Sequence, residues 1–161
     1  MSITLINVGV AQVKEAQTPA ILRTILGSCV GICIYERTKK IGGLAHILLP
    51  SDHTGGTTPE KYADTAIPLL VDRLIKQGGK KEFMSAKIAG GASMFKFESN
   101  VTLGQIGNKN VEVTKTILEK IGIPVVDEDT GGNVGRVIDF FLEDGRLKVK
   151  SGGAEKYYYK N

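Results

Sequence analysis

The sequence predicts an α/β fold, a single-domain layered sandwich in which mixed or antiparallel β-sheet packs with two main helices. The first third of the chain consists of β-branched and apolar runs separated by glycine and charged residues, and two later segments have apolar residues at helical spacing. The 161 residues are 42% apolar and 24% charged, which is ordinary for one domain with a sizeable core. We therefore expect residues 1–161 to form one domain.

Strands are expected first. Apolar and β-branched runs cover residues 3–10, 20–26, 30–35 and 41–49, with turn-forming residues between them. The run that begins at Val30 is apolar at successive positions, so both of its faces should be buried. These four runs predict that the first third of the chain is mostly sheet.

The first helix is expected to begin near Thr57, where threonine and proline precede an apolar repeat at residues 63, 67, 70, 71 and 74. Gly78 and Gly79 should end it. Pro68 lies inside this repeat and lacks the amide hydrogen that a helix interior needs. We therefore expect this helix to be bent or shortened.

The second helix is predicted by the apolar repeat over residues 111–121. Gly122 supplies a helix end, and Pro124 follows it. Strand-like runs return at residues 125–126, 137–142 and 147–149. The last third of the chain should therefore add strands to the sheet.

Composition excludes several classes of protein. No apolar run is long enough to span a bilayer and the N-terminus has no signal-peptide pattern, so we expect a cytoplasmic protein without membrane insertion. The net charge of +4 is spread over short lysine pairs, which favours a solvated surface over a nucleic-acid interface. The glycine-rich segments 89–93 and 130–133 lack the spacing of phosphate-binding motifs, and we expect no cofactor.

Cys29 is the candidate nucleophile. It follows Gly27 and Ser28 and directly precedes a buried strand, so small residues leave room for a substrate and for backbone N–H donors. An inert buried thiol fits the same position. Cys33, in the middle of the strand, is interpreted as a core residue, and both cysteines are expected to be reduced.

His46 is the candidate acid/base partner. It lies in a mostly apolar strand, where a lone imidazole is costly without a polar partner. A cysteine and a histidine on neighbouring strands can form the thiolate–imidazolium pair that activates a nucleophile. Thr24, shortly before the cysteine, is the hydroxyl expected to orient the histidine.

Two other interpretations compete with this one. Ser28 could be the nucleophile, but its surroundings lack the G-x-S-x-G pattern of a serine hydrolase. Cys29, Cys33, His46 and His53 approach the order of a Cys2His2 zinc site, which would suggest a nucleic-acid-binding module. Their last gap is too long and contains Pro50, so we expect no metal, and His53 is interpreted as an exposed loop residue.

The chain resembles the chemoreceptor glutamine deamidase family, CheD, over nearly its whole length. The matching segments, in the family's order, are residues 24–30, 46–50, 61–64, 89–95, 106–112 and 129–136. The resemblance implies a CheD-like α/β sandwich that hydrolyses glutamine side chains on methyl-accepting chemotaxis receptors to glutamate and releases ammonia, the activity of a protein-glutamine glutaminase. It also implies that Cys29 is the nucleophile, His46 its histidine and Thr24 the third catalytic residue.

The resemblance further implies partners. The substrates would be the cytoplasmic helices of chemotaxis receptors, and some family members also bind the phosphatase CheC. A non-catalytic adaptor that regulates CheC is therefore the main alternative to the enzyme. The mild positive charge of the chain would favour acidic receptor helices.

Overall fold

The computed structural model describes residues 2–93 and 105–161, which form two five-stranded sheets stacked with two helices. Sheet A has the order β1-β3-β8-β9-β10, and sheet B has the order β2-β5-β4-β6-β7. The strands are β1 (Thr4–Asn7), β2 (Gln12–Gln17), β3 (Ala20–Leu26), β4 (Val30–Glu36), β5 (Ile41–Ile47), β6 (Met84–Gly90), β7 (Val125–Thr130), β8 (Arg136–Phe141), β9 (Leu147–Ser151) and β10 (Ala154–Tyr158). The predicted α/β class is confirmed.

Both sheets are mixed. In sheet A, β1 runs parallel to β3 and the remaining pairs are antiparallel. In sheet B, β7 runs parallel to β6, while β2, β5, β4 and β6 are antiparallel neighbours. The chain therefore passes from sheet A to sheet B at the turn between β3 and β4, which contains Cys29.

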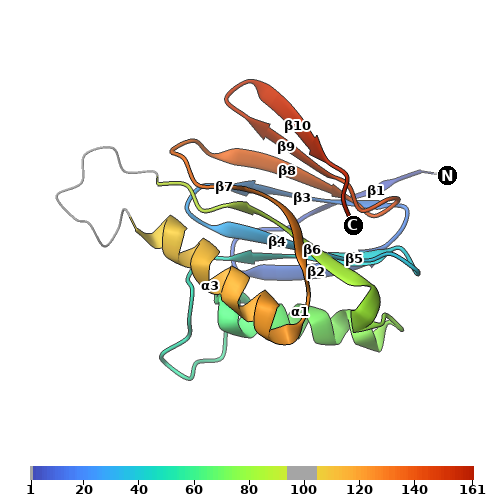
Figure 1. The fold of residues 1–161 in the computed structure, drawn as a ribbon, viewed down its shortest axis with the longest axis horizontal. Helices are drawn as coiled ribbons and strands as arrows, with labels where there is room; N and C mark the ends of the chain where they lie inside the picture. Colours follow the sequence, from blue (N-terminus) through green and yellow to red (C-terminus); the bar gives the residue numbers. More distant parts are fainter. Residues whose placement is uncertain (1, 94–104) are drawn as a thin grey trace.

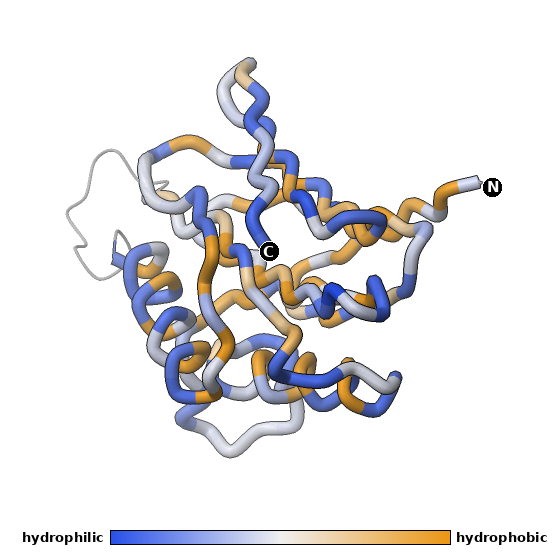
Figure 2. Tube along the Cα trace, turned by 45° about the vertical axis from the view of Figure 1, so that its right-hand side comes forward, coloured by the Kyte–Doolittle hydropathy of each residue, from blue (hydrophilic) through white to orange (hydrophobic). Residues whose placement is uncertain are grey.

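The layers follow the order sheet A, sheet B, helices (Figure 1). Helices α1 (Ala63–Lys76) and α3 (Ile106–Ile121) bury an apolar side against sheet B, and in Figure 2 both combine hydrophobic and hydrophilic residues around their axes. A second core lies between the sheets. It contains Leu22, Leu26, Ile138 and Phe140 from sheet A and Cys33, Tyr35, Leu44 and Ala89 from sheet B.

Three of the observed strands have no counterpart in the sequence-based prediction. β2 is an edge strand in which only Val13 is buried, so its sequence, QVKEAQ, shows little apolar signal. β6 is wholly buried but carries alanine, glycine and Lys87, and β10 buries only Tyr158. Pairing with neighbouring strands, and not local propensity, forms these elements.

The first helix begins later than predicted. Residues Pro59–Lys61 form a separate 3₁₀ turn, and α1 starts at Ala63 because Tyr62 is held in an extended conformation. Tyr62 forms a parallel bridge with Leu49. Pro68 is exposed, and α1 continues through it to Lys76, so the expected shortening does not occur. The second helix ends as predicted, at a left-handed Gly122.

Candidate active site

Cys29 lies in the short turn that joins sheet A to sheet B. β3 ends at Leu26 and β4 begins at Val30, so the turn is formed by Gly27, Ser28 and Cys29. The Cys29 side chain belongs to the core between the sheets but keeps 9% exposure. The thiol is thus located where the buried face of sheet B reaches the end of the sandwich.

His46 points to the same side of sheet B as the cysteine. In the antiparallel register, His46 of β5 is opposite Gly31 of β4, two residues beyond Cys29. Alternate residues of a strand share a face, so Cys29, Gly31 and His46 all face sheet A. Gly31 has no side chain, and Leu26 and Ile138 of sheet A pack directly over its Cα, within 3.0 to 3.5 Å of where a Cβ would lie.

Thr24 meets His46 from the opposite sheet. Its side chain is buried on the inner face of β3, and its Oγ1 lies 2.7 Å from His46 Nδ1. The same hydroxyl donates a hydrogen bond of 2.5 Å to the carbonyl of Val8, in the connection between β1 and β2. The expected contact between Thr24 and His46 is therefore present, and it crosses the space between the sheets.

These hydrogen bonds define the histidine tautomer. A threonine hydroxyl has a single hydrogen, and Thr24 uses it toward Val8. Thr24 must then accept from His46, which puts the imidazole hydrogen on Nδ1 and leaves a lone pair on Nε2. Among the residues that the structure describes, buried Nε2 has no hydrogen-bond partner. It is therefore available as a base on the face that carries Cys29.

The environment favours uncharged forms of both groups. Burial raises the pKa of the Cys29 thiol, and the residue's own backbone N–H partly offsets this shift. Burial also lowers the pKa of His46, against a smaller opposite effect of the Val8 carbonyl. The free protein therefore favours thiol and imidazole over the thiolate–imidazolium pair that the sequence suggests.

The glycine-rich segment after β6 holds the cysteine turn. The N–H groups of Gly91 and Ala92 donate to the carbonyls of Cys29 and Gly27, at 2.9 and 3.0 Å. A Cβ at Gly90 would lie 2.2 Å from the Cys29 carbonyl oxygen, so only glycine permits this approach. Segment 89–93 thus supports the backbone of Cys29, although Met94 and Phe95 of the same motif lie outside the described residues.

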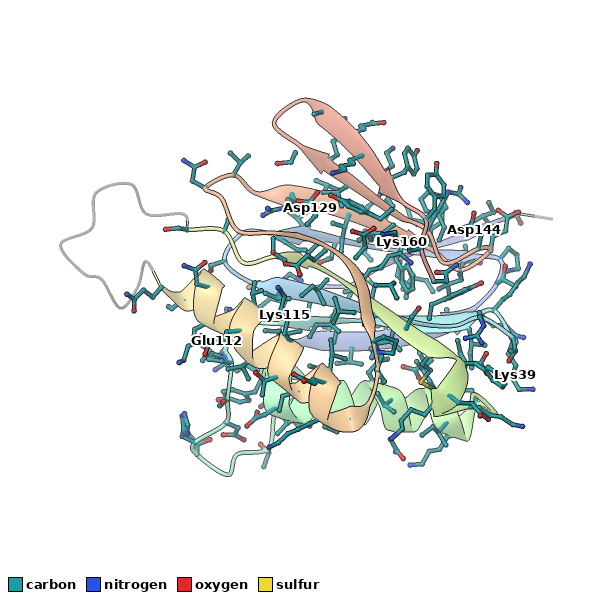
Figure 3. All side chains as sticks on the ribbon, viewed as in Figure 1. Lys39, Glu112, Lys115, Asp129, Asp144 and Lys160 are labelled. Atoms are coloured by element: carbon teal, nitrogen blue, oxygen red, sulfur yellow. The ribbon has the colours of Figure 1, made fainter. Side chains whose placement is uncertain are left out.

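A second glycine-rich loop, at Gly131, is held next to the first. Arg136 donates to the Gly131 carbonyl at 2.9 Å and pairs with Asp129 at 2.8 Å. Asp129, labelled in Figure 3, also accepts a 2.5 Å hydrogen bond from the Tyr158 hydroxyl. Since the N–H of Gly131 donates to the Gly90 carbonyl, this network braces the segment that supports Cys29.

A cavity of about 340 Å³ opens beside Thr24 and His46. Its rim includes Val10 and Ile25, which are 55% and 73% exposed. Arg23 also lines it and is paired with Asp139 by two hydrogen bonds. The histidine is therefore reached through an opening with an apolar rim and one charged side.

Comparison with known proteins identifies the family. A family model described as CheD chemotactic sensory transduction matches residues 48–151. The probable chemoreceptor glutamine deamidase CheD of Caldanaerobacter subterraneus subsp. tengcongensis is 46% identical over 156 residues, which are 95% of this chain and 96% of that protein. The chain belongs to the CheD family. The probable chemoreceptor glutamine deamidase CheD of Methanococcus maripaludis strain C6 is 43% identical, with 94% and 98% coverage.

One solved structure shares the CheD fold of this chain at low sequence identity. The Neisseria meningitidis protein NMB0706, described by the family model DUF152, has a TM-score of 0.53 and 9% identity. The match covers 81% of this chain and 64% of that one. The similarity concerns the fold alone.

The structure also places the residues of the competing interpretations. His53 is exposed, whereas Cys33 is buried in the core between the sheets, and burial raises its pKa to about 12. Within residues 2–93 and 105–161, no group of three or more His, Cys, Asp or Glu side chains is arranged to hold a metal ion. In the same ranges, no helix is both long and apolar enough to cross a membrane.

Sequence reasoning missed two contributors to this CheD site. The Val8 carbonyl carries no side-chain signal, because any residue at that position would present the same oxygen. Asn110 lies far along the chain on α3, yet its side chain donates to the carbonyls of Ser28 and Leu48 at 3.0 and 3.1 Å. The apolar repeat predicted the helix only from residue 111, whereas α3 begins at Ile106, so Asn110 fell outside the predicted helix and carried no signal.

Proposed function

We propose that this chain hydrolyses glutamine side chains on chemotaxis receptors to glutamate, with Cys29 as nucleophile and His46 as acid and base. The observation that carries the proposal is the hydrogen bond between Thr24 and His46. It leaves Nε2, which has no partner among the described residues, on the side of sheet B whose core contains Cys29. The names of its relatives, chemoreceptor glutamine deamidases, support this substrate class.

The first half of the reaction forms a thioester. As Cys29 Sγ bonds to the side-chain amide carbon, His46 Nε2 accepts the thiol proton and negative charge collects on the amide oxygen. The imidazolium then gives that proton to the amide nitrogen while the carbon–nitrogen bond breaks. Ammonia leaves, and the acyl group stays on the sulfur.

The second half of the reaction uses water. His46 Nε2 takes a proton from a water molecule as its oxygen adds to the thioester carbon. The carbon–sulfur bond breaks, the proton returns from His46 to Cys29, and the product is a glutamate side chain. Thr24 holds the imidazole throughout, so one nitrogen serves both half-reactions.

Proton transfer during attack fits the electrostatics of the site. Burial shifts the pKa values of Cys29 and His46 toward uncharged groups, so a preformed ion pair is disfavoured. An approaching amide closes the space around the thiol, and the charge then develops on the amide oxygen, where backbone donors can stabilise it. His46 therefore acts as a general base in the attacking step.

The substrate is expected to enter over the cavity beside Thr24 and His46. The apolar rim at Val10 and Ile25 suits the nonpolar residues of an amphipathic helix. Receptor glutamines of this kind lie on cytoplasmic helices, so the proposed reaction belongs in the cytoplasm.

The proposal is tested by incubating a folded chemoreceptor cytoplasmic domain with this protein and scoring each glutamine by mass spectrometry for conversion to glutamate. Wild type should convert specific glutamines, and Cys29→Ala should convert none. Cys33→Ala is the matched control, since it removes the other cysteine from the core and should retain conversion.

Equal conversion by Cys29→Ala and wild type would contradict the proposed mechanism. Conversion by neither protein would contradict the enzymatic function and favour a non-catalytic regulator of the phosphatase CheC. Binding of purified CheC to wild type and to Cys29→Ala would then be measured, because an adaptor should not need the thiol.

A further inference from the structure

Asn110 is a fully buried amide that touches both segments of the proposed active site. Its Nδ2 donates to the carbonyl of Ser28, directly before Cys29, and to the carbonyl of Leu48, shortly after His46. Both hydrogens of one amino group are therefore used on backbone atoms of two different elements. A single side chain on α3 connects the cysteine turn to the end of β5.

The three carbonyls of the cysteine turn are held in different ways. Those of Gly27 and Cys29 accept from the backbone N–H groups of Ala92 and Gly91. The carbonyl between them, that of Ser28, accepts from the side chain of Asn110. Substitution at residue 110 therefore releases the middle peptide while its two neighbours remain fixed.

That middle peptide carries the N–H of Cys29. The C=O and N–H of a trans peptide point in opposite directions, so a Ser28 carbonyl directed at Asn110 turns the Cys29 N–H away from α3. This N–H lies on the side of the cysteine's own sulfur. Among the described residues, it donates to no other backbone group outside the strands.

We propose that Asn110 is a positioning residue that orients the Ser28–Cys29 peptide so that the Cys29 N–H donates to the oxyanion formed during attack. Charge develops on the amide oxygen bonded to the same carbon that Sγ attacks, so a donor beside the sulfur is suitably placed. The inference rests on the proposed deamidation. It gives α3 a role in stabilising the oxyanion. The side chains of Cys29 and His46 do not provide this stabilisation.

The test variant is Asn110→Leu, which keeps a similar side-chain size but removes both donors. The expected result is a kcat lower by about 100- to 1,000-fold, the effect of losing one oxyanion donor, with a nearly unchanged KM. Alkylation of Cys29 by iodoacetamide forms no oxyanion, so its rate should fall far less than kcat. Its pH profile should move only slightly upward, because the displaced N–H no longer lowers the pKa of the thiol.

Two variants on the same helix serve as controls. Thr114→Val removes a buried hydroxyl that contacts neither active-site carbonyl, and Asn108→Leu replaces an exposed amide. Both should retain kcat. If Asn110→Leu is unfolded by circular dichroism, Asn110→Asp keeps the side-chain shape, lacks the amino group and should show the same loss of kcat.

The outcomes separate this inference from the proposed function. A wild type that converts no glutamine contradicts the function, whereas an active wild type with normal kcat in Asn110→Leu overturns the role of Asn110. A parallel loss of kcat and alkylation would also overturn it, since the defect would then lie in the thiol or in His46. A crystal structure of Asn110→Leu tests the geometry without substrate: a rotated Ser28–Cys29 peptide is expected, and an unchanged one contradicts the proposal.

Discussion

The Thr24 hydroxyl has one hydrogen and must serve two neighbours at once. It donates to Val8 and accepts from His46, so the direction of each hydrogen bond determines the other. A serine in the same place could form both bonds, whereas a valine of similar shape could form neither. The position of the His46 lone pair therefore depends on a residue in the opposite sheet.

We expect Thr24→Val to lower kcat by at least about 10-fold, because His46 loses the acceptor that holds its ring and its tautomer. Thr24→Ser is the matched control and should retain most of the activity. Steady-state deamidation kinetics on the receptor domain measure both. Equal kcat values for the two variants would show that the hydroxyl does not orient His46.

The lowered pKa of His46 also predicts how the stability of the fold depends on pH. Its pKa in the folded protein lies below the reference value of 6.5, so below that pH the unfolded chain binds the proton more readily than the folded one. The free energy of unfolding should therefore fall as pH drops below 6.5, until the folded imidazole is protonated as well. Half-buried carboxylates such as Asp129, whose pKa is lowered, lose their contribution only at more acidic pH.

Urea denaturation of wild type and His46→Gln at several pH values measures this dependence. Wild type should lose stability as the pH falls below 6.5, and His46→Gln should lose much less. Identical slopes in this window would assign the acid sensitivity to other groups.

At the scale of elements, the end of β6 determines the path of the cysteine turn. Gly90 has φ of +105° and its missing side chain lets the strand approach the carbonyl of Cys29. In the sequence, Gly90 stands out only as part of a glycine-rich segment without phosphate-binding spacing. In the structure Gly90 is the last residue of a central strand that pairs with β4 and β7.

Gly90→Ala should destabilise the fold and reduce deamidation. The added methyl group would lie 2.2 Å from the Cys29 oxygen, and relieving such overpacking costs about 1–3 kcal/mol beyond the backbone strain. Gly152→Ala is the control, since Gly152 has φ of +56° with open space around it and should cost strain alone. Urea midpoints compare the two variants, and an equal loss would show that the β6 backbone can move away from Cys29.

At the scale of the whole molecule, a buried lysine links sheet B to the C-terminal residue. Lys87 is 2% exposed, and its Nζ donates to the Gly145 carbonyl and to Asn161 Oδ1, both at 2.9 Å. Asn161 in turn donates to the Asp144 carbonyl, which places the C-terminus at the turn between β8 and β9 (Figure 3, Asp144 and Lys160). Burial lowers the pKa of Lys87, so its hydrogen-bond partners are important for stability.

Asn161→Ala should lower the free energy of unfolding by about 1–3 kcal/mol, since it leaves a buried ammonium group with one protein partner fewer. The same substitution in a Lys87→Met background should cost much less. Lys160→Ala, an exposed neighbour, should change stability by less than about 0.5 kcal/mol. Chemical denaturation of these variants forms a double-mutant cycle, and purely additive losses would rule out the coupling of Lys87 and Asn161.

The sequence alone determined the features that depend on local pattern. The α/β class, β3, the region of β4 and β5, and the end of α3 at Gly122 follow from apolar periodicity and helix-ending glycine, which act over a few residues. Cys29 and His46 could also be selected, because a thiol after small residues and an imidazole in an apolar strand are conspicuous locally. Thr24 was selected by its place near the cysteine.

Only the tertiary structure decided how these residues meet. β2, β6 and β10 exist because neighbouring strands pair with them, and the division into two sheets puts Thr24 and His46 on facing layers. The Val8 carbonyl and Asn110 became part of the site through contacts between distant segments, which leave no periodic trace in the sequence. Backbone hydrogen bonds and strand pairing use N–H and C=O groups that almost every residue carries. Residue type therefore cannot indicate which of these backbone groups lie in the site, and only the folded chain determines it.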